Sequence, residues 1–168
     1  MFTACCFIGM LIAAVQAPRV GEPVPVFAGS ATDGTQVRSD DLKGHWTVLY
    51  FYPKAFTPGC TAEACALRDG FSSLQEAGVV IYGISLDPLD TLKKFKAEYR
   101  LPFELISDTD KTMARAFHTL APMGLYTERR TFIIDPNGRI AHIFEKVDTR
   151  THDKEVMEAV TRLKAAAQ

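Results

Sequence analysis

Apolar residues in this chain gather in short continuous runs, and the two longest runs of the domain each lead into a segment with helical character. Residues 46–52 and 79–86 are almost wholly apolar, which is typical of strands buried on both faces of a sheet. The first leads through a turn into an Ala-rich helix over residues 60–77, ended by Gly78. The second leads into a helix over residues 87–99. This alternation predicts a central sheet with helices on both sides.

The remaining elements follow from turn residues that separate shorter apolar segments. Prolines make residues 20–27 extended, and turn chemistry at residues 31–35 predicts a hairpin ending near residue 37. The pattern then predicts a short turn at 39–42, a strand at 103–106, a short helix at 111–117, a loop at 118–127, a hairpin of 129–134 with 139–146, and a helix at 152–167. This order favours an α/β domain with an N-terminal β extension.

Length and charge limit what this domain does. With 168 residues, of which 47% are hydrophobic, the chain is long enough for one domain with a substantial core and too short for two. Its 19 basic and 20 acidic residues form no long charged run, so the sequence carries no electrostatic footprint for nucleic acid or an anionic membrane. A small neutral substrate or a protein partner fits this composition better.

The first seventeen residues differ from the rest of the chain. Residues 2–15 carry no charge and are nearly all apolar, yet this run is shorter than the ~20 residues of a membrane-spanning helix. Small or short residues at positions 15–17 suit a signal peptidase, so we expect residues 1–17 to be a signal peptide and residues 18–168 to be the domain. Cleavage implies an exported, periplasmic protein. A true start at Met10 implies a cytoplasmic one, and an uncleaved anchor is a third alternative.

The chemistry of the chain is concentrated between residues 53 and 65. Cys60 lies where the first buried strand passes through a turn into a helix, and Pro53 and Pro58 constrain that turn. Gly59 lets backbone amides come close to whatever binds beside the sulfur. The unpaired amides and the positive dipole end of the helix favour a thiolate over a thiol. The sequence therefore predicts a reactive thiol at Cys60.

Cysteine usage supports a redox role. Cys5 and Cys6 lie in the leader, so its removal leaves Cys60 and Cys65, five residues apart, which suggests an internal redox couple more than a structural disulfide framework. In a regular helix the Cα atoms of such residues lie roughly 8–9 Å apart, whereas a disulfide needs about 7 Å or less. If both cysteines share a helix, its start must unwind before they bond. Gly70 within the predicted helix would ease this step.

At these residues the chain resembles a known family. The spacing Pro53-x-x-x-Thr57-x-x-Cys60 matches the active-site motif of peroxiredoxins, and residues 60–65 resemble the subgroup called PrxQ or bacterioferritin comigratory protein. The similarity covers nearly everything from about residue 20 onward, including residues 50–53, 129–138 and 145–148. It implies a thioredoxin-like fold with a central mixed β-sheet flanked by helices. It also implies thiol-dependent reduction of peroxides without a metal or other cofactor.

The resemblance assigns the reaction to the two cysteines. It implies that Cys60 attacks hydrogen peroxide or an organic hydroperoxide and becomes a sulfenic acid, which Cys65 resolves as an intramolecular disulfide. A thioredoxin-like protein would then reduce the disulfide, and the enzyme would be a monomer or weak dimer. The chain departs from many members at Ala55 and Phe56, which replace acidic residues and predict a more apolar pocket mouth. Residues 124–128 vary within the family and leave the preferred peroxide open.

Further side chains receive roles from the same resemblance. Arg129, rather than its neighbour Arg130, would supply a guanidinium that favours the thiolate and donates hydrogen bonds to the transferring oxygens. Thr57 would hydrogen-bond the peroxide through its hydroxyl, and Pro53 would shield the thiolate from water. Glu63 would orient the local basic groups.

Three other functions use the same residue types. A metal site could draw on the cysteines and four histidines, but no Cys-x-x-Cys or His-x-x-x-His pair occurs, so no metal site is predicted. A thioredoxin-type disulfide exchanger would need Cys-x-x-Cys at the helix start. A peroxide sensor or redox-controlled holdase acting on a partner protein is compatible with the sequence. Steady-state turnover with excess reductant would separate it from a peroxidase.

Overall fold

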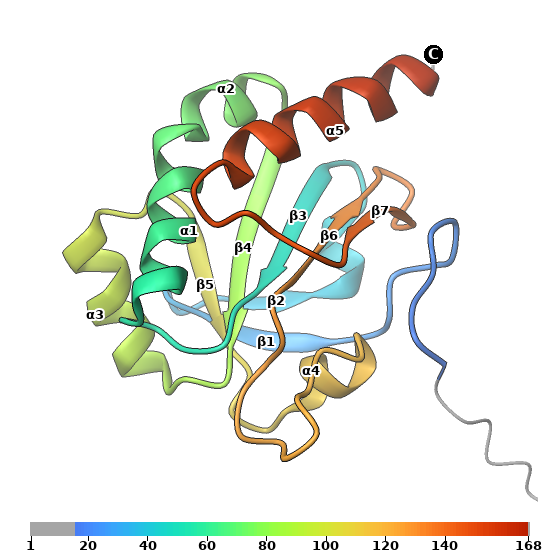
Figure 1. Ribbon diagram of the computed structural model, residues 1–168. Helices are drawn as coiled ribbons and strands as arrows, with labels where there is room; N and C mark the ends of the chain where they lie inside the picture. Colours follow the sequence, from blue (N-terminus) through green and yellow to red (C-terminus); the bar gives the residue numbers. More distant parts are fainter. Residues whose placement is uncertain (1–15, 168) are drawn as a thin grey trace, which may run out of the picture.

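A seven-stranded mixed sheet forms the centre of the computed structural model, which describes residues 16–167 (Figure 1). The strands are β1 (Ala28–Ala31), β2 (Gln36–Arg38), β3 (Trp46–Phe51), β4 (Val79–Ser85), β5 (Glu104–Ser107), β6 (Arg130–Ile134) and β7 (Ile140–Phe144). They lie in the order β2-β1-β5-β4-β3-β6-β7, with β3, β4 and β5 parallel and the other neighbouring pairs antiparallel. This topology confirms the predicted mixed sheet with an N-terminal β extension.

Strand β3, which lies inside the sheet between β4 and β6, separates two hydrophobic cores. Val48, Tyr50 and Tyr52 pack in one core, and Leu49 and Phe51 pack in the other. Successive side chains of a strand point to opposite faces, so a continuous apolar run fills both cores at once. This explains why residues 46–52 show no polar alternation. The turn that follows β3 therefore begins inside the sheet, between two neighbouring strands.

Helices cover both faces of the sheet, as predicted. The first core receives side chains from α1 (Pro58–Asp69), α2 (Phe71–Glu76), α3 (Leu89–Tyr99) and α5 (His152–Ala166). The second core is closed by α4 (Thr112–Ala116) and by a 3-10 turn (Ser39–Leu42). On the first face, α5 packs against both α1 and α2 (Figure 1). The C-terminal helix therefore reaches the helix that carries both cysteines.

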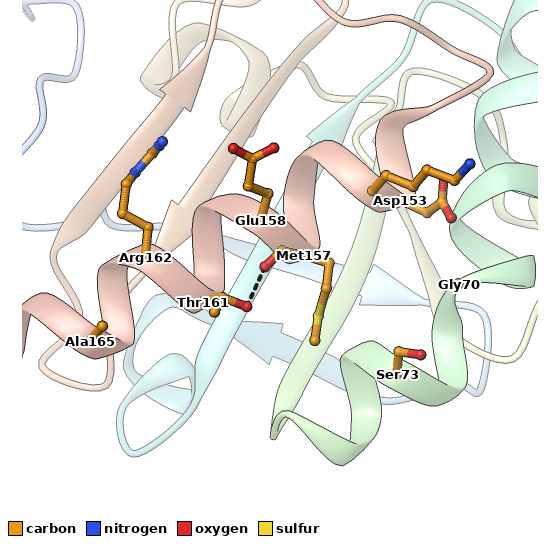
Figure 2. A pocket seen from close by; sticks show the side chains of 9 residues that line it. Gly70, Ser73, Asp153, Met157, Glu158, Thr161, Arg162 and Ala165 are labelled. Carbon is orange, nitrogen blue, oxygen red and sulfur yellow. Dashed lines mark hydrogen bonds between the residues drawn. The ribbon is translucent and has the colours of Figure 1, made fainter.

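The predicted continuous helix over residues 60–77 is wrong, because Gly70 divides it into α1 and α2. The backbone of Gly70 has φ −86° and ψ 0°, and the chain resumes helical structure at Phe71. A Cβ added to Gly70 would lie 2.7 Å from the Cβ of Asp153 in α5. Figure 2 shows α5 passing beside this junction, with Asp153 next to Gly70. Glycine is thus required here for close packing between helices.

Other boundaries move by one or two residues. The third strand begins at Glu104 instead of residue 103, and α3 begins at Leu89 because Asp87 is used in the active-site turn. The N-terminal hairpin forms as predicted, and β1 also pairs with β5, so the extension joins the main sheet. Among the described residues, no helix is both long and apolar enough to cross a membrane. Residues 1–15 of the predicted leader lie outside the described part of the chain.

Candidate active site

Cys60 lies in the first turn of α1, and the residue is 1% exposed. The helix begins here because Thr57 has extended backbone angles and precedes Pro58, whose fixed φ and missing amide suit the first helical position. A backbone hydrogen bond runs from Thr61 N to Thr57 O at 2.9 Å. Amides earlier in the turn have no acceptor within the helix, so the positive end of α1 lies at the sulfur.

Arg129 brings a guanidinium to this sulfur from the segment just before β6. Its Nη2 donates a hydrogen bond to Cys60 Sγ across 3.3 Å, and its Nη1 is ion-paired with Glu63. Arg130 points elsewhere, with its Nε 2.9 Å from Oε2 of Glu145. The structure therefore places Arg129, and not Arg130, beside the sulfur. A positive charge in hydrogen-bond contact favours the thiolate form.

Glu63 lies one turn after Cys60, so both side chains leave the same face of α1. The carboxyl is fully buried, and its Oε2 forms the ion pair with Arg129. Burial raises the pKa of Glu63 to about 7, although the positive charge of Arg129 acts in the opposite direction. The sequence-based role for Glu63, orientation of a basic group, is compatible with this contact.

Thr57, Pro53 and Gly59 lie in the turn between β3 and α1. Thr57 Oγ1 donates a hydrogen bond to the carbonyl of Lys54 at 2.8 Å, so its proton closes the turn and its oxygen can accept another hydrogen bond. Pro53 follows β3 closely and is half-buried. A Cβ on Gly59 would lie 3.3 Å from Nη2 of Arg129, so glycine leaves room for the guanidinium. Three of the predicted substrate-binding residues thus lie around this turn, and the fold adds Arg129 from the segment before β6.

Cys65 lies on the same helix as Cys60 and is half-buried, and both thiols are free. Regular helical geometry separates their Cα atoms by roughly 8–9 Å, too far for a disulfide. Near the end of α1, Leu67 is fully buried and Arg68 Nη1 donates to the carbonyl of Tyr99 at 3.0 Å. The structure is therefore that of the dithiol form.

Sequence reasoning missed two residues that hold the active-site turn. Asp87 Oδ2 accepts a hydrogen bond from the amide of Ala55 at 2.8 Å, and Thr127 Oγ1 donates to the carbonyl of Tyr52 at 2.7 Å. Asp87 follows β4, which is parallel to β3, so a search of the carboxyl ends of neighbouring strands would have found it. Thr127 follows a loop of irregular sequence and left no such signal.

An open groove of about 540 Å³ adjoins the turn; its lining residues are Pro53, Lys54, Leu86, Asp87, Pro88, Leu125 and Tyr126. Phe56, beside it in sequence, is 41% exposed and packs edge-on against Phe95 with ring centroids 5.1 Å apart. A separate groove of about 630 Å³ lies between α5 and the α1–α2 junction, and none of the active-site residues lines it (Figure 2). Within residues 16–167, no group of three or more His, Cys, Asp or Glu side chains is placed to hold a metal ion.

Comparison with known proteins agrees with this geometry. The model of the AhpC/TSA family matches residues 20–143. Peroxiredoxin Bcp of Bacillus subtilis is 38% identical over 150 residues, which are 84% of this chain and 94% of the relative. Peroxiredoxin Bcp of Escherichia coli is 37% identical over 145 residues, which are 83% of this chain and 93% of the relative. A solved structure of the Xanthomonas campestris bacterioferritin comigratory protein has a TM-score of 0.75 and 34% identity, covering 84% of this chain and 92% of that one.

The chain therefore belongs to the AhpC/TSA family, and its mixed sheet with flanking helices is the thioredoxin-like fold of that family. Within the family it is a peroxiredoxin of the Bcp/PrxQ subfamily. Its activity is that of a thiol-dependent peroxidase, and its substrate is a peroxide. These findings confirm the family, fold and activity expected from the sequence.

Proposed function

We propose that Cys60 is the peroxide-reactive thiol and that Cys65 completes the cycle as the resolving thiol. The observation that carries the first assignment is the hydrogen bond from Arg129 Nη2 to Cys60 Sγ at the positive end of α1. Two independent positive features converge on this sulfur, while Cys65 lies well inside the same helix. Cys60 is therefore the thiol placed to attack the peroxide.

In the first step the Cys60 thiolate attacks one peroxide oxygen and the O–O bond breaks. The sulfur loses two electrons and becomes a sulfenic acid, and the other oxygen leaves as hydroxide or alkoxide, which takes a proton from solvent. Arg129 is placed to stabilise the charge that moves onto the leaving oxygen. Thr57 Oγ1, whose proton is engaged with Lys54, would accept a hydrogen bond from the peroxide. Pro53 would shield the sulfur from water.

Both hydrogen peroxide and organic hydroperoxides fit this site. The related Xanthomonas campestris protein is described as having alkyl peroxide reduction activity. In this chain the groove beside Pro53 is bordered by Leu86, Leu125 and Tyr126, and the last two are exposed. An organic group attached to the peroxide would cover part of this apolar surface.

In the second step the thiolate of Cys65 attacks the sulfenic sulfur, a disulfide forms, and the hydroxyl leaves as water after gaining a proton. The distance across a regular helix forbids this reaction, so residues 61–66 must unwind first. The buried Leu67 and the contact of Arg68 with Tyr99 would confine the unwinding to the start of α1. A dithiol protein of the thioredoxin type would reduce the disulfide.

We further propose that the enzyme acts as a monomer or weak dimer, and that its compartment depends on residues 1–17. If this leader is cleaved, the enzyme works after export, in the periplasm, and needs an exported dithiol reductant. Otherwise it works in the cytoplasm. N-terminal sequencing of protein purified from fractionated cells distinguishes the two.

The experiment that tests the cysteine roles uses one equivalent of peroxide without reductant. Cys60→Ser should leave the peroxide unconsumed, because Cys65 lacks the contacts at the helix start. Cys65→Ser should consume one equivalent and accumulate a sulfenic acid that proceeds more readily to sulfinic acid. Peroxide loss and mass spectrometry of the intact protein measure both results. Consumption of an equivalent by Cys60→Ser would overturn the assignment.

A further inference from the structure

A fully buried histidine lies behind the active-site guanidinium and has no part in the mechanism above. His152 is the first residue of α5 and is 0% exposed. Its Nε2 lies 3.9 Å from Oε1 of Glu63, the carboxyl whose other oxygen is ion-paired with Arg129. Glu63 Oε1 has no hydrogen-bond partner in the described part of the chain. The carboxyl thus faces Arg129 on one side and the imidazole on the other.

The imidazole is fixed through both of its nitrogens. Nε2 lies 2.9 Å from Thr131 Oγ1 on β6, and Nδ1 lies 3.3 Å from Oε2 of Glu155, one turn along α5. An ionised Glu155 can only accept, so Nδ1 carries the proton and Nε2 accepts from the Thr131 hydroxyl. Burial lowers the pKa of His152 to about 4, and the nearby charge of Arg129 acts in the same direction. The ring is therefore neutral near pH 7.

Five titratable groups face Glu63 from the elements packed around it: Cys60 on its own helix, Tyr50 on β3, Tyr52 just after β3, Arg129 before β6 and His152 on α5. Burial keeps Tyr50 and Tyr52 uncharged because it raises the pKa of both phenols. With a neutral imidazole, Arg129 is the one cation among these five. The position and charge of Glu63 thus determine how strongly the Arg129 guanidinium interacts with the Cys60 sulfur.

We propose, on the basis of the proposed function, that His152 is a positioning residue for the peroxide step: its neutral ring keeps water from Glu63, and so keeps Arg129 on the Cys60 sulfur. Removal of the ring would admit water to Glu63 Oε1 and favour the ionised carboxylate. A full negative charge would strengthen the contact of Arg129 Nη1 with Glu63 at the expense of the contact of Nη2 with the sulfur. Peroxide attack would then slow although no group that touches the peroxide had changed.

The protonation of Glu63 should make the effect of removing the His152 ring depend on pH, whereas a simple loss of packing should not. With the ring present, the raised pKa of Glu63, about 7, leaves much of the carboxyl uncharged at neutral pH. As the pH rises through that value the wild-type carboxyl ionises as well, and the difference between wild type and a ring-less variant shrinks. A purely structural defect would lower the rate by a factor independent of pH.

The test measures the second-order rate of Cys60 oxidation by hydrogen peroxide in a single turnover, between about pH 6 and about pH 8, around the Glu63 pKa. His152→Ala should be slower than wild type by at least about tenfold at the acid end, as expected for a displaced catalytic contact. This ratio should fall as the pH rises. His152→Phe, which restores a neutral ring, should recover most of the rate.

Val156→Ala is the matched control, because Val156 is fully buried one turn further along α5. It should lower stability without changing the rate or its pH dependence. A His152→Ala to wild-type ratio that is constant with pH, or a His152→Phe rate as low as that of His152→Ala, would overturn the inference. Failure of wild-type Cys60 to react would instead overturn the proposed function, so the two outcomes are distinct.

Discussion

The Nη2 of Arg129 lies 3.3 Å from the sulfur of Cys60, although the two residues are 69 positions apart in the chain. β3 and β6 are antiparallel neighbours in the sheet, and this pairing places the residue before β6 beside the turn that follows β3. The contact therefore depends on strand register as much as on either side chain. A shift of one residue would present Arg130 to the sulfur instead.

Replacement of Arg129 should slow the first step strongly. Arg129→Met removes the hydrogen bond to the sulfur and the donor for the leaving oxygen, and loss of one such donor costs about 100-fold or more. Arg130→Met should change the rate little, because Arg130 pairs with Glu145. Stopped-flow measurement of Cys60 oxidation compares the two variants. A larger loss from Arg130→Met would assign this role to Arg130 instead.

Weakening the start of α1 should speed disulfide formation without changing peroxide attack. Ala62 lies between the two cysteines, and glycine in a helix interior costs about 1 kcal/mol relative to alanine. Ala62→Gly should therefore raise the unwound fraction about fivefold. Quenched-flow thiol counting after one equivalent of peroxide gives the rate of disulfide formation.

Amide exchange provides the direct measure of that unwinding. Residues 61–66 should be protected in the dithiol form and exchange rapidly in the disulfide form. The matched control for Ala62→Gly is Ala97→Gly in α3, which weakens an exposed helical position away from the cysteines and should leave disulfide formation unchanged. Equal protection of residues 61–66 in both redox states would contradict the unwinding step.

Gly70→Ala should destabilise the protein even though alanine is the better helix former. The added Cβ would lie 2.7 Å from the Cβ of Asp153, so α5 must shift or the junction must open. Overpacking of this kind typically costs about 1–3 kcal/mol. Urea unfolding measures the change, with Ser73→Ala at an exposed position of α2 as the control. A stabilised Gly70→Ala protein would show that α5 does not restrict this position.

Acid should reduce stability partly through His152. Burial lowers its pKa from 6.5 to about 4, so its contribution is complete above pH 6.5 and is lost as the pH falls through about 4. Because the raised pKa of Glu63 acts oppositely, wild type must be compared with His152→Phe. The stability lost on acidification should be smaller in the variant by at most about 3 kcal/mol. If urea unfolding shows that wild type and His152→Phe lose the same stability on acidification, this would contradict a buried neutral ring at position 152.

Local patterns predicted the part of the site that is contiguous in sequence. Pro53, Thr57, Gly59 and Cys60 belong to one turn whose geometry follows from a buried strand, two prolines and a helix start. Arg129 required the family resemblance, because spacing alone cannot reveal which distant residue a strand pairing will bring to the sulfur. His152 gave no signal, since an isolated histidine is compatible with many environments.

The same limit explains the error in the helices. The segment from Pro58 to Glu76 has helical character, and a glycine in a helix interior is tolerated at a cost of about 1 kcal/mol. What requires glycine at position 70 is the close approach of Asp153, 83 positions later, and no local pattern reveals that contact. Continuous apolar strands, by contrast, were predicted well, because the unbroken apolar run of β3 is by itself enough to indicate burial on both faces.

Glu63 lies between the two cysteines on α1, and this has a kinetic consequence. The unwinding that would bring Cys65 to Cys60 would also withdraw Glu63 from Arg129 and break the hydrogen bond between Arg129 and the Cys60 sulfur. Peroxide and reductant would then act on two mutually exclusive shapes of one enzyme. A second peroxide could not be processed until the reductant had restored the helix. Each turnover would be strictly ordered, with the oxidising and reducing partners meeting the enzyme in alternation and never competing for the same form.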